Sequence, residues 1–331
     1  MNNEEEILDF DDEPVKKEEK IERKVLNLKK GGILDRFGED CTKKTYITNP
    51  AIARDEEIKQ MILILLTPDK SAILVGLPGV GKTAVVEGLS YRIGKGEVPD
   101  LLKDWSIIKV NTTALIGGAG GTVESRIQDL VDELKNLDNV ILFIDEIHTL
   151  IGNTEGSLDI ANMLKPCLDR GSIKMIGATT YEEYDRYIVR DRAFLRRFER
   201  VDVPEPDAET ALKIMMGSYP RIEAKTGIKL KYSSFVIEMI CKFLIDSTSE
   251  YKRIFGMSSQ YPDICLTHLS KAFSYALFEN SPVVTLKHVY KALINSQNIY
   301  PDVIKKQAIV FKNEFKDILE DDGMTVEDLD K

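Results

Sequence analysis

The sequence predicts an α/β fold in which helices flank a five-stranded parallel sheet, followed by a small all-helical domain. Two observations carry this prediction. Short β-prone runs alternate with helical patterns in the first part of the chain, and the pattern is helical throughout after Pro204. The expected strands are residues 72–75, 106–110, 140–144, 174–178 and 200–203.

A glycine-rich loop follows the first expected strand and leads into a helix-forming stretch. Residues 76–83 read GLPGVGKT, which matches the pattern G-x-x-x-x-G-K-[ST]. The glycines let successive backbone N–H groups point inward at the positive end of the following helix, an arrangement that binds phosphate. Lys82 is expected to reach the β- and γ-phosphates, and the Thr83 hydroxyl to take one Mg²⁺ position. The loop therefore predicts an ATP site contacted by Gly76, Pro78, Gly79, Val80, Gly81, Lys82, Thr83 and Ala84.

A pair of carboxylates follows the run 140–144. That run is apolar throughout, as expected of a strand buried on both faces of a parallel sheet. Asp145 is expected to hold Mg²⁺ through its water shell, and Glu146 to orient and polarise the attacking water. Two carboxylates after a strand also occur as a solvated turn, but the phosphate loop upstream favours the catalytic interpretation.

Amphipathic patterns locate the expected helices. One core-facing stripe consists of Val123, Ile127, Leu130, Val131 and Leu134. In the second part, helices are expected near residues 208–218, 233–248, 263–278 and 286–294. The expected domains are a charged tail (1–32), the α/β nucleotide-binding domain (33–204), a helical domain (205–299) and a helix with an acidic tail (300–331). The family resemblance given below implies that the last two are a lid and a connector.

The composition disfavours several other classes of protein. No apolar stretch approaches the roughly 20 residues of a membrane span, and the first residues lack the basic and apolar regions of a signal peptide, so a cytoplasmic protein is expected. The four cysteines contain no C-x-x-C pair and the three histidines form no ligand cluster, which disfavours disulfides and zinc. His148 is interpreted as a packing residue.

The net charge of −10 is concentrated in the two ends of the chain. Residues 1–20 hold nine acids and three lysines, and residues 314–331 hold eight acids and two lysines, so the ends carry −12 and the rest about +2. Acidic, aromatic-poor ends are typical of solvated tails, although a docking peptide for a partner is an alternative. The nearly neutral body disfavours binding to nucleic acid.

Several stretches resemble the first ATPase module of the Clp-type AAA+ unfoldases. Besides the phosphate loop and VILFIDEIHTL, NMLKP (162–166) and IGATT (176–180) occur in the family's order and at its spacing. ILDRFG (33–38) and NPAIARDEE (49–57) are similar to the family's segment that encloses the adenine. The resemblance covers about residues 33–315. It implies an ATPase that assembles as a hexameric ring and acts on a protein partner.

The resemblance also implies roles outside the two ATP motifs. Ala51 and Ile52 fall at the apolar positions that contact adenine. Thr180 matches sensor 1, where a hydroxyl detects the γ-phosphate and the attacking water. Arg196 and Arg197 match the paired arginine fingers that a subunit offers to its neighbour's ATP, where guanidinium stabilises charge on the transferred phosphoryl group.

Some positions depart from the family's pattern. Pro262 and Asp263 match the start of the lid helix that faces the nucleotide, but Ile264 stands where the family has lysine, and no residue is assigned as sensor 2. The pore loop, residues 115–123, is short, glycine-rich and without an aromatic side chain, so a weak grip on polypeptide is expected. No receptor domain, middle domain, second ATPase module or peptidase-docking tripeptide is identified, so a single ring layer is expected.

Two functions of different classes therefore stay open. One is an ATP-dependent machine that pulls on or dissociates a protein partner. The other is a nucleotide-controlled binding module that regulates or loads a partner without threading it. A DNA-handling AAA+ protein is disfavoured because the chain has no basic stripe.

Overall fold

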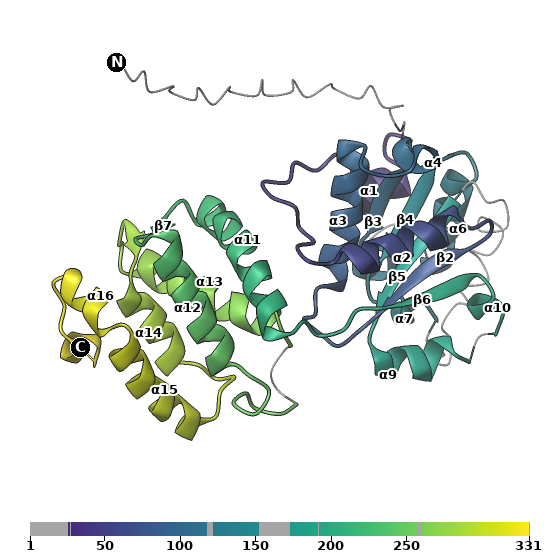
Figure 1. The fold of residues 1–331 in the computed structure, drawn as a ribbon. Coiled ribbons are helices and arrows are strands. Elements are labelled where there is room, and N and C mark those ends of the chain that lie inside the picture. Colours follow the sequence, from purple (N-terminus) through teal and green to yellow (C-terminus); the bar gives the residue numbers. More distant parts are fainter. Residues whose placement is uncertain are drawn as a thin grey trace, which may run out of the picture.

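The computed structural model describes residues 26, 28–117, 122–151, 173–190, 192–256 and 260–330. They form two lobes, an α/β lobe that ends with the strand β6 and a helical lobe that starts with the helix α11 (Figure 1). Within the described ranges, no helix is both long and apolar enough to cross a membrane.

The α/β lobe is built on a six-stranded sheet with the order β1-β3-β4-β5-β2-β6. Five of these strands run parallel, which confirms the predicted sheet. The edge strand β1 pairs antiparallel with β3, and its sequence Gly-Glu-Asp has no apolar residue by which it could be predicted. The strands are β1 (Gly38–Asp40), β2 (Ser71–Val75), β3 (Ser106–Val110), β4 (Val140–Ile144), β5 (Ile173–Thr179) and β6 (Phe198–Asp202).

Helices cover both faces of the sheet. They are α1 (Ile33–Phe37), α2 (Asp55–Leu66), α3 (Lys82–Lys95), α4 (Asp100–Lys103), α5 (Thr112–Gly117), α6 (Val123–Leu134), α7 (His148–Ile151), α9 (Tyr181–Glu183) and α10 (Arg192–Leu195), with a π-helical turn η1 (Tyr184–Ile188). Successive strand residues point to opposite faces. Ala72 and Leu74 of β2 therefore join the core beneath α2 and α3. Ile73 and Val75 join the core beneath α1, α5 and α6.

The apolar stripe predicted for residues 123–134 is confirmed in α6. Four of its residues are buried and the first packs at the margin of the same core: Ile127, Leu130, Val131, Leu134 and Val123. Thr122 begins this helix, because its hydroxyl accepts a hydrogen bond from the Ser125 N–H at 3.2 Å.

The helical lobe has a core of its own, in which the ring of Phe243 contacts those of Phe311 and Phe315. Two predicted helices have the expected bounds, while α11 runs past its expected end at residue 218 and through Pro220. The elements are α11 (Ala208–Thr226), β7 (Lys229–Leu230), α12 (Ser234–Ser247), α13 (Asp263–Phe278), β8 (Val283–Val284), α14 (Leu286–Ile294), α15 (Pro301–Glu314), α16 (Lys316–Asp321) and the 3-10 turn η2 (Val326–Asp330).

The lobes meet along the segment that precedes α2. Ile52 lies so close to α11 that a Cβ added to Gly217 would overlap its side chain. The Thr48 hydroxyl donates to the Gly217 carbonyl at 3.3 Å. On the other side of the junction, the Gln260 N–H donates to the Pro78 carbonyl at 3.3 Å. The helical lobe therefore contacts both the segment before α2 and the glycine-rich loop.

Candidate nucleotide site

The glycine-rich loop connects β2 to α3. Gly79 and Gly81 have φ angles of 82° and 97°, in the left-handed region that glycine adopts without steric cost. Gly81 is the N-cap of α3, so the unpaired N–H groups of the first helical turn open onto the loop, and Ala84 lies in that turn. The Val80 side chain is buried in the core beneath α2 and α3, which leaves only its backbone as a possible nucleotide contact.

Lys82 lies inside the loop that it is expected to share with phosphate. Its ammonium donates to the carbonyls of Gly76 and Leu77 at 2.9 and 3.1 Å. Burial lowers the pKa of this ammonium, because desolvation disfavours the charged form. Three carboxylates oppose the effect, those of Asp145, Glu183 and Glu146. Lys82 is thus a partly desolvated cation surrounded by acids.

Thr83 and Asp145 are brought together, as the two motifs predicted. The Thr83 hydroxyl donates to Asp145 Oδ2 at 2.9 Å, although the two residues are 62 positions apart. The same Oδ2 lies 3.5 Å from the ammonium of Lys109, at the end of β3. A hydroxyl and a carboxylate are the hard oxygen ligands that suit Mg²⁺, so the residues present fit this ion.

Glu146 is exposed and has a φ angle of 53°. Residues other than glycine rarely adopt this region, and such strain is typical of functional sites. A cavity of about 510 Å³ opens beside it, with Asp145, Lys109 and Asn111 in its lining. The Glu146 carboxylate therefore faces space that a water molecule can enter.

Thr180 follows β5 and begins the short helix α9. Its hydroxyl accepts from the Glu183 N–H at 3.3 Å, while the Thr180 N–H donates to Glu183 Oε2 at 3.0 Å. The two residues thus form a reciprocal capping box. The preceding residue, Thr179, is buried and donates its hydroxyl to the same Oε2 at 3.1 Å.

These side chains gather because the order of the parallel strands places their carboxyl ends together. β5 lies between β4, which leads to Asp145, and β2, which leads to the loop at Gly76. Thr180 follows β5 itself. Ligands of open α/β sheets bind outside the carboxyl ends of the strands. The candidate site is therefore this edge of the sheet.

The expected adenine and lid contacts border this edge. Ala51 is buried against α3, where a Cβ on Gly88 would overlap its side chain. Pro262 and Asp263 begin α13, two and three residues after Gln260, which donates to the Pro78 carbonyl. The described structure thus brings both segments to the lobe junction beside the loop, and their contact with adenine stays a prediction.

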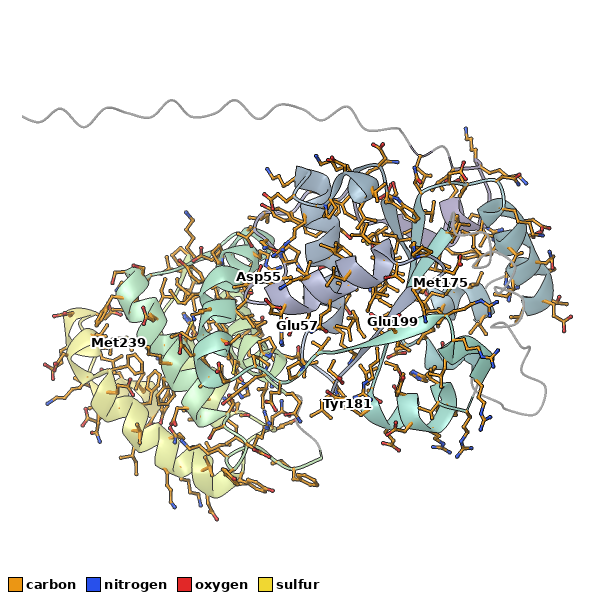
Figure 2. The ribbon with its side chains drawn as sticks, turned by 45° about the vertical axis from the view of Figure 1, so that its right-hand side comes forward. Asp55, Glu57, Met175, Tyr181, Glu199 and Met239 are labelled. Carbon is orange, nitrogen blue, oxygen red and sulfur yellow. The ribbon has the colours of Figure 1, made fainter. Side chains whose placement is uncertain are left out.

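Arg54 is a structural residue of this site that the sequence did not single out. It is only 5% exposed, and its guanidinium donates to the carbonyls of Val80 and Pro204 at 2.8 and 3.1 Å. It also pairs with Glu57 at 2.8 Å. Figure 2 shows Glu57, near the start of α2, on the side of the α/β lobe that faces the helical lobe. One arginine therefore ties the segment before α2 to the loop and to the end of β6.

Arg196 and Arg197 lie near the amino ends of the strands, whereas the loop lies at the carboxyl ends. The Arg197 carbonyl accepts from the Ser71 N–H at 2.7 Å, at the amino end of β2. The loop starts at the other end of that five-residue strand, and such a strand spans roughly 16 Å. Arg196 is exposed there. The structure does not bring the arginines to the ATP site of their own subunit.

His148, interpreted as a packing residue, also makes polar contacts. Its Nδ1 lies 3.1 Å from Glu183 Oε2 and 3.3 Å from Thr179 Oγ1. The ring also stacks on Tyr187 with centroids 6.2 Å apart. His148 belongs to a polar cluster because the turn after β4 carries it to the end of β5, which no local pattern indicates.

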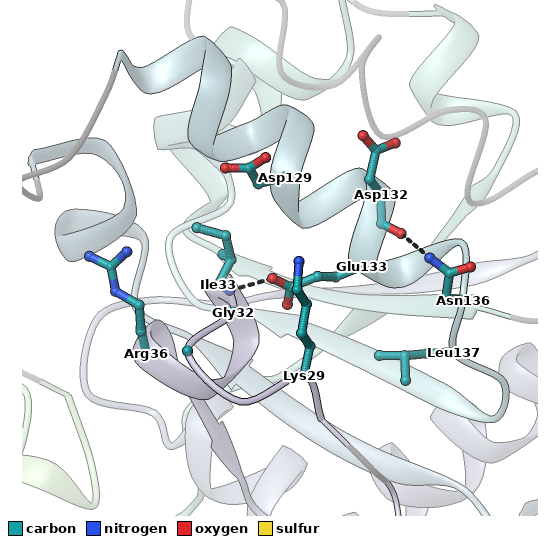
Figure 3. A pocket seen from close by; sticks show the side chains of 10 residues that line it. Lys29, Gly32, Ile33, Arg36, Asp129, Asp132, Glu133, Asn136 and Leu137 are labelled. Carbon is teal, nitrogen blue, oxygen red and sulfur yellow. Dashed lines mark hydrogen bonds between the residues drawn. The ribbon is translucent and has the colours of Figure 1, made fainter.

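A second cavity, of about 500 Å³, lies between α1 and α6, and none of the predicted ATP contacts lines it (Figure 3). Glu133 projects into it from α6 and accepts hydrogen bonds from the N–H groups of Ile33 and Leu34, the first residues of α1. This cavity reflects the attachment of α1 to α6.

Two predictions lie outside the described residues: most of the glycine-rich part of the pore loop (118–121) and the stretch NMLKP (162–166).

The sheet, the loop and the carboxylate pair together define a P-loop ATPase of the AAA+ class. Residues 72–202 match the model of the ATPase family associated with various cellular activities (AAA). The predicted resemblance to the Clp-type proteins is also confirmed by the relatives described below. Residues 72–202 therefore carry an AAA ATPase domain, and the chain is similar to the Clp-type chaperones.

Curated relatives include the chaperone protein ClpB of Helicobacter hepaticus, 46% identical over 210 residues that make up 61% of this chain and 24% of that protein. ClpB of Aquifex aeolicus is 46% identical over 204 residues, 60% of this chain and 20% of that protein. The chain thus spans between a fifth and a quarter of the length of these relatives.

Solved structures of Hsp104 are also similar. Hsp104 in a closed state with ATPγS and FITC-casein matches with a TM-score of 0.66 and 28% identity, over 86% of this chain and 49% of that chain. The extended complex of Saccharomyces cerevisiae Hsp104 with casein gives a TM-score of 0.65 and 31% identity, over 80% of this chain and 47% of that chain. The likeness therefore extends beyond the residues that match the family model.

Proposed function

We propose that this chain hydrolyses ATP with Mg²⁺ as a subunit of a hexameric ring and uses the energy to remodel a protein partner. One observation carries the proposal. The loop at Gly76, the Asp145–Glu146 pair and Thr180 follow three neighbouring parallel strands, so their side chains share one edge of the sheet. A phosphate cradle, a metal ligand and a candidate base on one edge are the parts that phosphoryl transfer requires.

Binding rests on the loop and on Lys82. A partly desolvated ammonium gains from an anionic partner, so Lys82 is expected to exchange the carbonyls of Gly76 and Leu77 for phosphate oxygens. Thr83 and Asp145 would hold Mg²⁺, which when bound neutralises charge on the phosphates. The ammonium of Lys109 lies 3.5 Å from the same Asp145 oxygen and forms an ion pair with it.

Turnover rests on Glu146 and Thr180. The Glu146 carboxylate borders an open cavity, and its proposed role is to orient and polarise the attacking water. Thr180, at the end of β5, is proposed to detect the γ-phosphate through its hydroxyl. Glu146 and Thr180 therefore act on the reacting end of the nucleotide, whereas Lys82 acts mainly on its binding.

The ring is supported by the position of Arg196 and Arg197. They lie at the amino end of β2, a strand's length from the loop of the same subunit. An arginine that stabilises phosphoryl transfer from there has to act on a neighbouring copy. A protein partner is supported by the relatives, since two of the similar Hsp104 structures contain casein.

The function is tested with two variants and matched controls. Lys82→Ala should lose tight binding of ATP, whereas Glu146→Gln should retain binding and lose turnover. Lys59→Ala and Glu97→Gln, at exposed positions, should resemble the unmodified protein. Binding is measured with a fluorescent ATP analogue, and hydrolysis by phosphate release. Equal hydrolysis by Glu146→Gln and the unmodified protein would overturn the catalytic assignment.

The class of machine is tested by adding unfolded casein. A protein remodeller should hydrolyse ATP faster in its presence, because an engaged chain changes the ring's rate of turnover. A nucleotide-controlled binding module should show no response to casein. An unchanged rate with casein, combined with normal basal hydrolysis, would favour the binding module.

A further inference from the structure

We infer that Glu183 is a positioning residue that ties the Thr180 turn to the segment after Asp145–Glu146. This inference rests on the proposed ATPase function and adds a residue to the same site. Neither the glycine-rich loop nor the carboxylate pair predicts Glu183, which lies in the helix after β5. The segments after β4 and β5 meet at its carboxylate.

The contacts converge on one oxygen atom. Glu183 Oε2 lies 3.0 Å from the Thr180 backbone nitrogen and 3.1 Å from the Thr179 hydroxyl. The same oxygen lies 3.1 Å from His148 Nδ1. Burial alone would raise the pKa of Glu183, but the hydrogen bonds from Thr180 and the nearby His148 lower it below its ordinary value. The carboxylate is therefore held in its ionised form by the groups it joins.

His148 makes the connection to the catalytic carboxylate. It lies two residues after Glu146, at the start of α7. Thr179 donates its hydroxyl hydrogen to Glu183, so the Thr179 oxygen is left to accept. His148 Nδ1 lies 3.3 Å from that oxygen and 3.1 Å from the carboxylate. Because both oxygens can accept, we assign the ring proton to Nδ1. A shift of either turn therefore stretches a contact to the other.

A capping role by itself does not account for this arrangement. The capping box with Thr180 would satisfy N–H groups at the amino end of α9 without Thr179 or His148. Glu183 in addition acts electrostatically on Lys82, in the glycine-rich loop. Its contacts thus reach the segments after both β4 and β5.

The test uses Glu183→Ala, His148→Ala and the double variant in the full chain. Turnover should fall roughly 10- to 100-fold in Glu183→Ala, because the groups that act on the attacking water lose their alignment. The affinity for ATP should change less than about twofold, because Lys82 and the loop are intact. The double variant should lose no more than the more impaired single variant, since both remove one connection.

Two further variants separate positioning from stability. Glu183→Gln keeps a carbonyl oxygen that can accept from Thr180 and Thr179, so its turnover should lie between those of Glu183→Ala and the unmodified protein. Glu182→Ala changes the neighbouring exposed acid and should leave turnover unchanged. Turnover is expressed per bound ATP, so that a smaller folded fraction does not lower it.

The outcomes distinguish this inference from the proposed function. Absence of ATP hydrolysis by the unmodified protein would overturn both. Normal turnover per bound ATP in Glu183→Ala, together with hydrolysis by the unmodified protein, would overturn the inference alone. Equal losses of affinity and turnover would also overturn it, because they would assign Glu183 to binding.

Discussion

Arg54 shows how one buried charge holds three segments of the site in place. Its guanidinium reaches the carbonyl of Val80 in the loop and the carbonyl of Pro204 after β6, and it pairs with Glu57 in α2. The Glu57 side chain is only 13% exposed. Removal of one partner from a buried pair leaves the other charge without compensation, which is costly.

Arg54→Ala is therefore expected to destabilise the protein by about 3 kcal/mol and to weaken ATP binding. Urea denaturation and nucleotide titration measure the two effects. The control is Arg92→Ala, which removes an ion pair with the more exposed Asp55 and should cost less than about 1 kcal/mol. Similar losses in the two variants would show that the buried position of Arg54 is unimportant.

His268 makes the stability of the helical lobe depend on pH. It is buried in α13, where Nδ1 lies 2.8 Å from the Ile264 carbonyl and Nε2 2.8 Å from the Ser296 hydroxyl. Burial lowers its pKa below the ordinary value of 6.5, although the bond to Ile264 opposes the shift. The unfolded chain then binds more protons at this histidine than the folded one. His268 therefore costs no stability above about pH 6.5, and the free energy of unfolding falls as the pH drops toward the lowered pKa.

The expected result is a decrease in the free energy of unfolding between pH 7.5 and 5.5, with a smaller slope in His268→Gln. Part of the slope should persist in the variant, because burial also lowers the pKa of His288. The pKa values of Glu183 and Glu279 are also lowered, but these groups change the pH dependence of stability only below their ordinary pKa of 4.5. An unchanged slope in His268→Gln, from urea denaturation at each pH, would contradict this assignment.

At the scale of elements, α3 is a helix whose two interior glycines have different surroundings. A Cβ on Gly88 would overlap the side chain of Ala51 and lie 3.1 Å from Ile58. A Cβ on Gly94 would have no heavy atom within 4 Å. The first glycine therefore lets the segment before α2 approach the helix, and the second has no packing role.

Gly94→Ala is expected to stabilise the protein by about 0.5–1 kcal/mol, because alanine loses less backbone entropy in a helix. Gly88→Ala should instead destabilise it and weaken ATP binding, because Ala51 has to move. Thermal unfolding of the two variants measures the contrast. The same sign of effect in both would mean that helix propensity outweighs packing at Gly88.

Elements with a repeating apolar pattern could be predicted from the sequence, and elements without one could not. The five parallel strands and the stripe of α6 were identified because burial imposes a period on neighbouring residues. The strand β1 has no such pattern and exists because its backbone pairs with β3. The helix α11 continues beyond its expected end at residue 218 to Thr226, and it passes through Pro220 although proline commonly stops a helix.

At the scale of the whole molecule, the two ends of β2 serve different subunits of the proposed ring. The loop lies at the carboxyl end, and Arg196 and Arg197 lie beside the amino end. A heterologous contact that repeats around a closed ring joins such unlike surfaces. Each subunit would then contribute the binding half of one site and the arginines of the next.

Arg197→Ala is expected to bind ATP and lose hydrolysis, and Lys82→Ala to lose binding. Mixing the two variants in equal amounts should restore activity, because random assembly leaves about a quarter of the sites with both halves intact. Arg190→Ala, an exposed arginine in a nearby turn, serves as the control and should hydrolyse normally. Hydrolysis that is neither restored by mixing nor dependent on protein concentration would argue for a monomeric enzyme.

The sequence by itself determined the glycine-rich loop, the carboxylate pair and the parallel strands that carry them. Each depends on residues a few positions apart, whose relative placement follows from local backbone geometry. The tertiary structure alone decided which distant groups join them. Arg54 meets carbonyls 26 and 150 positions away, and Glu183 meets His148. Such contacts depend on the order of strands in the sheet, and no spacing along the chain encodes that order.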